Sequence, residues 1–373
     1  MSHLVVGLMS GTSLDGVDAA VVDFSASAPR LVGTHFVAYP AQLRADVLAL
    51  NTAGDNELDR ARRVGLELAR LYAHATLQLL GGLNIAAHDV EAIGCHGQTV
   101  RHRPDAGYTV QLGDGAMLAE ATGICVVADF RSRDIAAGGQ GAPLVPAFHQ
   151  AIFGDARIHR VIANLGGIAN ITNLPSSEST NASPIGFDTG PGNLLLDLWV
   201  ELHRGRTRDD GGAWAASGAV DQALLDRMMS DDFLSRPPPR STGRDHFNAR
   251  WLAQMGVESR DAADVQATLA EFTAQSLAQA IRIWCGAPRE VLLCGGGVHN
   301  DDLVKRITSA LPAARVASTA SLGIDPDYVE ACAFAWLAWR ALHHLPGNLP
   351  AVTGARGARV LGAIYPAGPV GRT

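Results

Sequence analysis

Three glycine-rich stretches of the chain carry the residue types that can surround a phosphate group. They are Gly11–Asp18, the pair Gly166 and Gly167, and the run Gly295–Gly297. Glycine lets a backbone come close to a ligand, and N–H groups in tight turns can bond phosphate oxygens. Together the stretches predict a nucleotide site. Its expected contacts are Gly11, Thr12, Ser13, Leu14, Asp15, Gly16, Val17, Asp18, Gly166, Gly167, Gly295, Gly296 and Gly297.

Two carboxylates in the first stretch could hold a cation. Asp15 and Asp18 offer the oxygen ligands that Mg²⁺ prefers, directly or through water. The same stretch could instead be an ordinary hairpin closed by polar residues. The run Gly295–Gly297 could equally start a helix or permit tight packing. The presence of three such stretches in one chain favours phosphate binding.

The better-known phosphate motifs are absent from the chain. It contains neither GxxxxGK[ST] nor GxGxxG, which argues against a P-loop enzyme and a Rossmann dehydrogenase. The single lysine, Lys305, follows the triple glycine on a predicted helix, whereas a protein kinase needs a lysine on a strand. A phosphate site in this chain must therefore work without a lysine.

Predicted strands surround the glycine stretches. The runs Leu4–Ser10 and Val17–Phe24 flank the first stretch, and Arg160–Asn164 and Ile168–Leu174 flank the second. Each of these two stretches is therefore expected to form the turn of a β-hairpin. Two such hairpins indicate an internal duplication. Further strands are expected at Leu31–Ala38, Val90–Cys95, Ile124–Asp129, Glu290–Cys294 and Val360–Tyr365, and helices at Glu57–Leu80, Asp264–Cys285 and Glu330–Leu342.

Composition narrows the class of protein. With 373 residues, the chain is long enough for two domains. Its net charge of -7 and the absence of a basic run argue against a nucleic-acid partner. No apolar stretch approaches the 18 or so residues of a membrane span, and no signal peptide is evident. Five cysteines without a CxxC pair favour reduced thiols and a cytoplasmic setting.

Short motifs also follow one another in order along the chain. They are Gly7–Asp18, His96–His102, Asp129–Arg131 with Ala137–Pro143, Asn164–Asn170, Gly186–Asn193, Cys294–Gly297, Glu330–Leu337 and Val352–Ala355. This set resembles the anhydro-N-acetylmuramic acid kinase family over almost the whole chain.

The resemblance implies an α/β fold of the actin, Hsp70 and sugar-kinase superfamily. Two lobes of duplicated ribonuclease-H-like topology are then expected, with an ATP cleft between them. Residues 1–128 plus 345–373 would form the N-terminal lobe with the first phosphate hairpin. Residues 129–344 would form the C-terminal lobe with the second hairpin, the catalytic aspartate and the nucleoside-binding glycine run.

The resemblance also implies the reaction. With ATP and Mg²⁺, water would open the 1,6-anhydro ring of anhydro-N-acetylmuramic acid while O6 is phosphorylated. The product, N-acetylmuramic acid 6-phosphate, belongs to peptidoglycan recycling. The enzyme would be a phosphotransferase with an alcohol-group acceptor, cytoplasmic, and a homodimer.

Two carboxylates are the expected catalytic groups. In the anhydro sugar O6 is bonded to C1, so a base must act on water, and we assign this role to Asp188 in a glycine-rich turn. Asp188 could instead cap that turn or a helix starting near Asn193. Glu330 begins a predicted helix and could orient the water or the sugar, or could merely match the helix dipole.

Polar residues after two predicted strands are the expected sugar contacts. His96, Gln98 and Thr99, with the neighbouring Arg101, could bind the sugar ring and its acetamide. Arg131 could bind the lactyl carboxylate through a bidentate pair. Asp129 or Asp134 could form ion pairs with the arginines beside them.

Three other functions remain open from the residues. A conventional sugar or acyl kinase of the same superfamily would act on a free hydroxyl or carboxylate. A nucleotide-gated module of the Hsp70 or actin type would need no small-molecule acceptor. A glycoside hydrolase using Asp188 and Glu330 would need no ATP, but it would leave the glycine turns unexplained.

Overall fold

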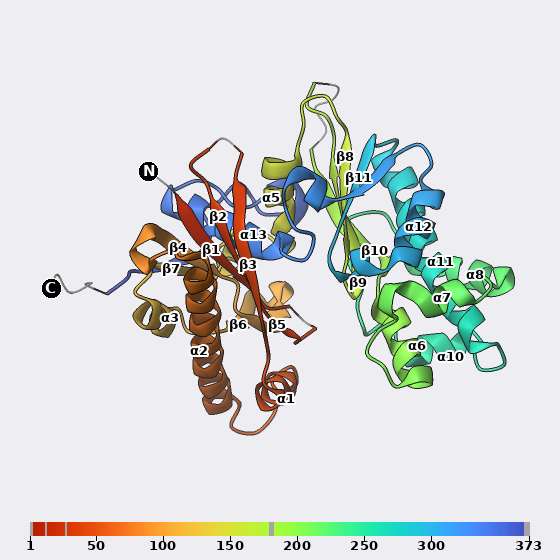
Figure 1. Cartoon of the computed structure of the whole chain (residues 1–373), viewed down its shortest axis with the longest axis horizontal. Helices are drawn as coiled ribbons and strands as arrows, with labels where there is room; N and C mark the ends of the chain where they lie inside the picture. Colours follow the sequence, from red (N-terminus) through yellow and green to blue (C-terminus); the bar gives the residue numbers. More distant parts are fainter. Residues whose placement is uncertain (1–2, 12, 27, 179–182, 369–373) are drawn as a thin grey trace. The chain divides into compact units, whose positions relative to one another are not determined.

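The computed structural model describes residues 3–11, 13–26, 28–178 and 183–368 (Figure 1). It contains two compact units, one formed by Met1–Ile152 with Tyr328–Thr373 and the other by Phe153–Asp327. These boundaries differ from the expected division at 128/129 and 344/345. Residues 129–152 belong to the first unit, and residues 328–344 do so because the helix that follows Tyr328 packs on the sheet of that unit.

The first unit is built around a six-stranded sheet with the order β13-β7-β4-β1-β2-β3. The strand β1 pairs antiparallel with β2 and parallel with β4, and β4 pairs parallel with β7. The strands are β1 (Leu4–Met9), β2 (Gly16–Asp23), β3 (Arg30–Ala38), β4 (Val90–Cys95), β7 (Val126–Ala128) and β13 (Ala363–Tyr365). The C-terminal strand β13 thus returns to the first unit, as the sequence predicts.

Helices cover both faces of this sheet, which explains why β1 is buried along its whole length. On one face, Val6 and Leu8 of β1 share a core cluster with Leu68 of α2 (Glu57–Leu83). On the other face lies α13 (Val329–Leu342). Both faces of the central strand β1 are therefore shielded from solvent.

The helix α13 approaches the sheet unusually closely. Gly7 of β1 and Gly94 of β4 are neighbours in the register. A Cβ atom would lie 1.8 Å from Ala331 O at the first position and 2.0 Å from Phe334 O at the second. Only glycine permits this contact between helix backbone and strand backbone, so these two residues determine where α13, with Glu330 in its first turn, can pack.

The remaining elements of the first unit differ slightly from expectation. The helix α2 runs through Gly81 and Gly82 and ends at Leu83, where Asn84 takes a left-handed conformation with φ 54°. A separate two-stranded sheet, which the sequence analysis missed, consists of β5 (Gln98–Arg103) and β6 (Tyr108–Leu112). The other helices are α1 (Ala41–Ala49), α3 (Gly115–Thr122), α4 (Ser132–Ala136), α5 (Val145–Phe153) and α14 (Pro350–Thr353).

The second unit repeats the strand order of the first. Its sheet runs β10-β9-β8-β11-β12, in which β10, β9 and β8 pair antiparallel and β8, β11 and β12 pair parallel. The series β3-β2-β1-β4-β7 has the same senses, so the duplicated α/β topology is confirmed. The strands are β8 (Arg160–Leu165), β9 (Ile168–Leu174), β10 (Ile185–Pro191), β11 (Glu290–Cys294) and β12 (Arg315–Ser318).

Helices of the second unit gather beside its sheet (Figure 1). The central one, α11 (Ala262–Ala280), is buried along most of its length and continues into a π-helical turn at Ile281–Cys285. The others are α6 (Leu194–Arg204), α7 (Ala213–Ser217), α8 (Gln222–Met229), α9 (Asp232–Ser235), α10 (Ala249–Gln254) and α12 (Asp301–Ala310). Across the described residues of both units, no helix is long and apolar enough to cross a bilayer.

Candidate active site

The first glycine stretch forms the turn between β1 and β2. Thr12 lies outside the described residues. Ser13 and Asp15 are exposed, whereas Leu14, with φ 58°, inserts its side chain into the core cluster of the first unit together with Val17. The side chains of Leu14 and Val17 therefore anchor the turn, and only their backbones remain available to a nucleotide.

Buried polar side chains hold this turn in place. Gln98 is buried, its Nε2 donates to Gly11 O at 3.2 Å, and its Oε1 accepts from Tyr39 OH at 3.0 Å. Ser10 Oγ donates to the carbonyl of Gly97 at 3.1 Å. Gln98 is thus turned toward the hairpin, as a positioning residue would be.

Two further candidates, Thr99 and Arg101, lie in the small sheet of β5 and β6 and form hydrogen bonds within the first unit. Thr99 Oγ1 accepts from Gln111 Nε2 at 3.0 Å. Arg101 pairs with Glu57, with Nη2 to Oε1 at 2.6 Å, and also contacts the carbonyl of Leu50. These contacts give Arg101 a structural explanation that the sequence did not reveal.

The side chains of His96 and Arg131 are hydrogen-bonded to each other. Arg131 donates from Nε at 3.2 Å and from Nη2 at 2.8 Å to His96 Nε2, and from Nη1 to Gly141 O at 2.9 Å. Burial, and next the charge of Arg131, lower the pKa of His96 to about 3. His96 is therefore a neutral imidazole whose Nδ1–H faces Ser10 O at 3.3 Å.

The carboxylate of Glu330 completes this group in the first unit. Burial raises the pKa of Glu330, and the positive charge of Arg131 opposes that rise. The three hydrogen bonds of Arg131 leave one N–H on each terminal nitrogen. The structure thus brings together His96, Arg131 and Glu330, which the sequence separates by up to 234 positions.

Asp129 and Asp134 do not form the ion pairs considered from the sequence. Asp129 Oδ1 accepts from Ser132 Oγ at 2.5 Å. Asp134 is fully buried and accepts from Asn348 Nδ2 at 2.6 Å and from Thr353 Oγ1 at 2.7 Å. Asp134 therefore ties α4 to the C-terminal segment, which explains the motif around Thr353.

Asp188 lies on a strand and not in the turn that the sequence suggested. It is in β10 opposite Asn170 of β9, and the register shifts between Asp188 and Gly190. Its Oδ2 accepts from Thr242 N at 2.9 Å. Burial raises the pKa of Asp188 to about 6, while the Thr242 N–H and the charge of Arg240 act in the opposite direction.

Arg240 is the residue that sequence reasoning missed. Its Nε donates to Asp188 O at 2.9 Å, and Asp188 N donates to Arg240 O at 3.2 Å. Its Nη1 also reaches the carbonyls of Leu234 at 2.7 Å and Arg236 at 2.8 Å, and its guanidinium lies 5.2 Å from the centre of the Phe187 ring. The one signal in the sequence was the unusual run Arg236–Gly243, with three consecutive prolines.

The second glycine turn joins β8 to β9 and receives the start of α6. Asn193 N donates to Gly166 O at 2.8 Å, and Leu194 N donates to Gly167 O at 3.0 Å. The chain reaches Asn193 directly from β10, so the strand that carries Asp188 is coupled to the glycine turn.

The third glycine run leaves the carboxyl end of β11. Gly295 has φ 78°, and a Cβ there would lie 2.3 Å from Asn164 Oδ1. A 3-10 turn at Gly296–His299 follows, and Asn300 then caps α12 by accepting from Leu303 N at 2.9 Å. Because β8 and β11 are parallel neighbours, the two glycine turns of this unit lie at the same end of the sheet, where both strands have their carboxyl ends.

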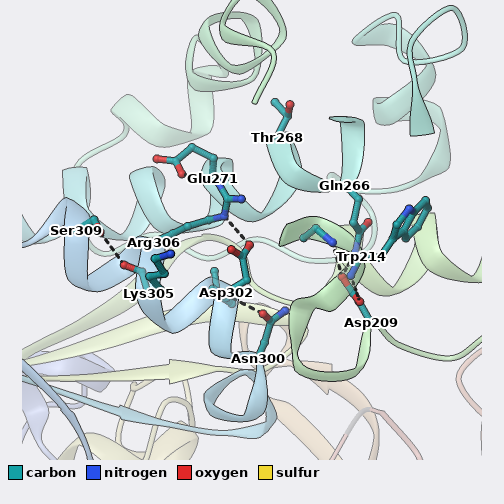
Figure 2. A network of polar contacts seen from close by, with 12 residues as sticks. Asp209, Trp214, Gln266, Thr268, Glu271, Asn300, Asp302, Lys305, Arg306 and Ser309 are labelled. Carbon is teal, nitrogen blue, oxygen red and sulfur yellow. Dashed lines mark hydrogen bonds and ion pairs between the residues drawn. The ribbon is translucent and has the colours of Figure 1, made fainter. Parts of the chain in front are cut away.

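A polar network holds the helix behind this run, as Figure 2 shows. Arg306 of α12 donates from Nε to Asp302 at 2.6 Å and from Nη1 to Glu271 of α11 at 3.0 Å. Asp209 accepts from the backbone N–H groups of Trp214 and Ala215, both at 2.9 Å. The helix α12, which follows the glycine run, is thus held against α11 by these polar contacts.

Known proteins match the chain over nearly its whole length. A family model described as anhydro-N-acetylmuramic acid kinase matches residues 3–367. A protein of that name from Nitrosomonas europaea is 52% identical over 364 residues, covering 97% of this chain and 99% of the relative. Another from Thiobacillus denitrificans is 53% identical over 367 residues, covering 97% of both.

Likeness to solved structures is weaker. The (R)-2-hydroxyglutaryl-CoA dehydratase component A of Acidaminococcus fermentans has 12% identity and a TM-score of 0.47, over 90% of this chain and 96% of that one. The assignment therefore rests on the family model and the sequence relatives. By the extent and identity of those matches, the chain belongs to the anhydro-N-acetylmuramic acid kinase family.

Proposed function

We propose that this chain is an ATP-dependent kinase that hydrolytically opens the 1,6-anhydro ring of anhydro-N-acetylmuramic acid and phosphorylates O6. The product is N-acetylmuramic acid 6-phosphate, an intermediate of peptidoglycan recycling. The observation that carries this proposal is the match at about 50% identity to anhydro-N-acetylmuramic acid kinases over nearly the whole chain.

Asp188 is the proposed general base. Water attacks C1 and gives a proton to the Asp188 carboxylate, the C1–O6 bond breaks, and O6 forms a bond to the γ-phosphorus as ADP leaves. A pKa of about 6 supports this role, because such a group is ionised at neutral pH and is a stronger base than an ordinary aspartate. Its hydrogen bond from Thr242 N holds one oxygen, which leaves Oδ1 for the water.

The group of His96, Arg131 and Glu330 is the proposed sugar site. The two remaining N–H groups of Arg131 can bind the lactyl carboxylate as a bidentate pair. Neutral His96 orients that guanidinium by accepting two of its hydrogen bonds. Glu330 orients the sugar or the water. Gln98 and Thr99 are further proposed sugar contacts; Gln98 also donates to the carbonyl of Gly11, and Thr99 accepts from the side chain of Gln111.

The three glycine stretches are the proposed ATP contacts. Their donors include the backbone of Gly11–Asp18, the turn Gly166 and Gly167, and the run Gly295–Gly297. Carboxylate oxygens suit Mg²⁺, and exposed Asp15 and half-buried Asp18 would hold this ion directly or through water. The bound metal would neutralise phosphate charge during transfer.

The decisive experiment is a product analysis in ¹⁸O-labelled water. ADP release should require the anhydro sugar, and mass spectrometry should find ¹⁸O at C1 and phosphate at O6. Release of ADP with ordinary free sugars, but not with the anhydro sugar, would replace this proposal with a conventional sugar kinase.

Cellular location and assembly are further parts of the proposal. All five cysteines are free thiols, which suits a reducing cytoplasm. The homodimer inferred from the family should appear as twice the 39.1 kDa chain mass in light scattering, and a monomer at micromolar concentration would contradict it.

A further inference from the structure

A group of potential metal ligands lies at the end of the first unit's sheet that is opposite to the phosphate hairpin. His3, Glu91 and His343 each offer one ligand atom, and these atoms lie within 4.8 Å of one another. His3 immediately precedes β1, Glu91 is in β4, and His343 immediately follows α13. The phosphate hairpin begins at the opposite end of β1, roughly 20 Å away at about 3.3 Å per residue.

The backbone directs Glu91 into this group through an irregularity in the sheet. The parallel register between β1 and β4 shifts between Leu4 and Val5, which leaves Glu91 as the extra residue of a bulge. Bulges re-aim side chains and are uncommon between parallel strands. The side chain of Glu91 therefore points where regular pairing would not place it.

One oxygen of Glu91 lacks a partner. Glu91 Oε1 contacts Nδ1 of His3, whereas Oε2 is buried and has no hydrogen-bond partner within the described part of the chain. A buried carboxylate oxygen left unpaired is costly. A cation at this position would satisfy it.

His343 is oriented as a metal ligand would be. Its Nδ1 donates to the carbonyl of Trp339 at 2.8 Å, so Nε2 carries the lone pair. The Trp339 ring lies 4.6 Å from the His343 ring and stacks on Phe24 at 5.4 Å. Histidine ligands in metal sites commonly donate their second N–H to a backbone carbonyl in this way.

We propose that His3, Glu91 and His343 bind a Zn²⁺ ion, with water in the remaining position. Two imidazoles and one carboxylate are a donor set that suits zinc, whereas Mg²⁺ favours oxygen ligands alone. The ion connects the start of β1, the bulge of β4 and the end of α13. It is separate from the proposed reaction and acts as a structural cross-link within the first unit.

The test is zinc binding by full-length, tag-free protein after treatment with a chelator. Calorimetry should show one Zn²⁺ per chain, and Zn²⁺ should raise Tm. Loss of a direct ligand should weaken binding by about tenfold or more, since loss of even an outer-shell partner costs that much. His343→Asn and Glu91→Gln should therefore both lose affinity and the rise in Tm.

The neighbouring histidine provides a matched control. His344 is exposed, lies outside the ligand group and has φ 54°, a conformation that asparagine tolerates. His344→Asn should bind Zn²⁺ like the wild type, and Co²⁺ should show a visible d–d spectrum in both but not in His343→Asn. Equal binding by the two asparagine variants, or no saturable binding at one ion per chain, would overturn the proposal.

Discussion

Two carboxylates, one in each unit, differ in how they are held. Asp188 is fixed by the Thr242 N–H, and its backbone is bonded in both directions to Arg240. Glu330 is influenced by the charge of Arg131, which itself is bonded to His96 and Gly141. Burial raises the pKa of both carboxylates. The comparison separates a proposed base that is held by hydrogen bonds from a carboxylate whose pKa depends on the neighbouring Arg131.

The largest expected effect is that of Asp188→Asn. Loss of the base should lower kcat by about 10² to 10⁴, while calorimetry with a non-hydrolysable ATP analogue should find nearly unchanged affinity. Asp226→Asn is the control, because Asp226 is an exposed aspartate of the same unit. Near-normal turnover in Asp188→Asn would remove Asp188 from the mechanism.

A smaller effect is expected for Glu330→Gln. If Glu330 orients water or sugar through one charge-assisted hydrogen bond, worth about 1.5 to 3 kcal/mol, kcat/KM should fall about 10- to 100-fold. Steady-state ADP release measures this directly. A loss as great as that of Asp188→Asn would show that the two carboxylates share the chemistry equally.

Arg131→Lys should lower kcat/KM about tenfold. Lysine keeps the charge but cannot form the bidentate pair or the two hydrogen bonds to His96. A substrate whose lactyl carboxylate is converted to an amide provides the control, because the wild type and the variant should then differ little. If the wild type and the variant differ in kcat/KM on the amide substrate as much as on the normal one, Arg131 does not bind the lactyl carboxylate.

The pH profile tests the raised pKa of Asp188. Because the base form is required, kcat/KM should fall about tenfold per pH unit below an apparent pKa of about 6. The contribution of Asp188 to folding stability should change with pH in the opposite direction to kcat/KM. The pKa of Asp188 in the folded protein lies above the ordinary value of 3.8, so the contribution of this group to the free energy of unfolding is fully present below pH 3.8 and is lost as the pH rises through about 6.

Asp188→Asn should remove this pH-dependent part of the unfolding free energy. Chemical denaturation of wild type and variant at pH 5 and pH 8 would measure it. A wild-type stability that rises between these pH values relative to the variant would contradict the assigned shift.

Local sequence signals predicted most of the fold. The strands Val90–Cys95, Ile168–Leu174 and Glu290–Cys294 agree with expectation to the residue, because each is a buried run bounded by turn residues. The strand β10 was missed, since Gly186, Gly190 and Pro191 weaken its strand pattern. Its pairing with β9 overrides that weak propensity.

The candidate site was predictable in its members but not in their arrangement. Asp188, Glu330, His96 and Arg131 were identified by family motifs, and their catalytic and binding roles stay predictions. Their surroundings come from distant segments: Arg240 lies 52 positions from Asp188, and Arg131 lies 35 from His96. No local pattern indicates such partners.

The sequence by itself determined most of the strands, the glycine turns and the family, because hydrophobic periodicity, turn chemistry and ordered motifs depend on residues that are close together in the chain. Tertiary structure decided that Glu330 belongs to the unit of His96, since Gly7 and Gly94 let α13 pack onto the sheet of that unit. It also decided the pKa of Asp188, because burial and charge depend on residues that only folding brings together.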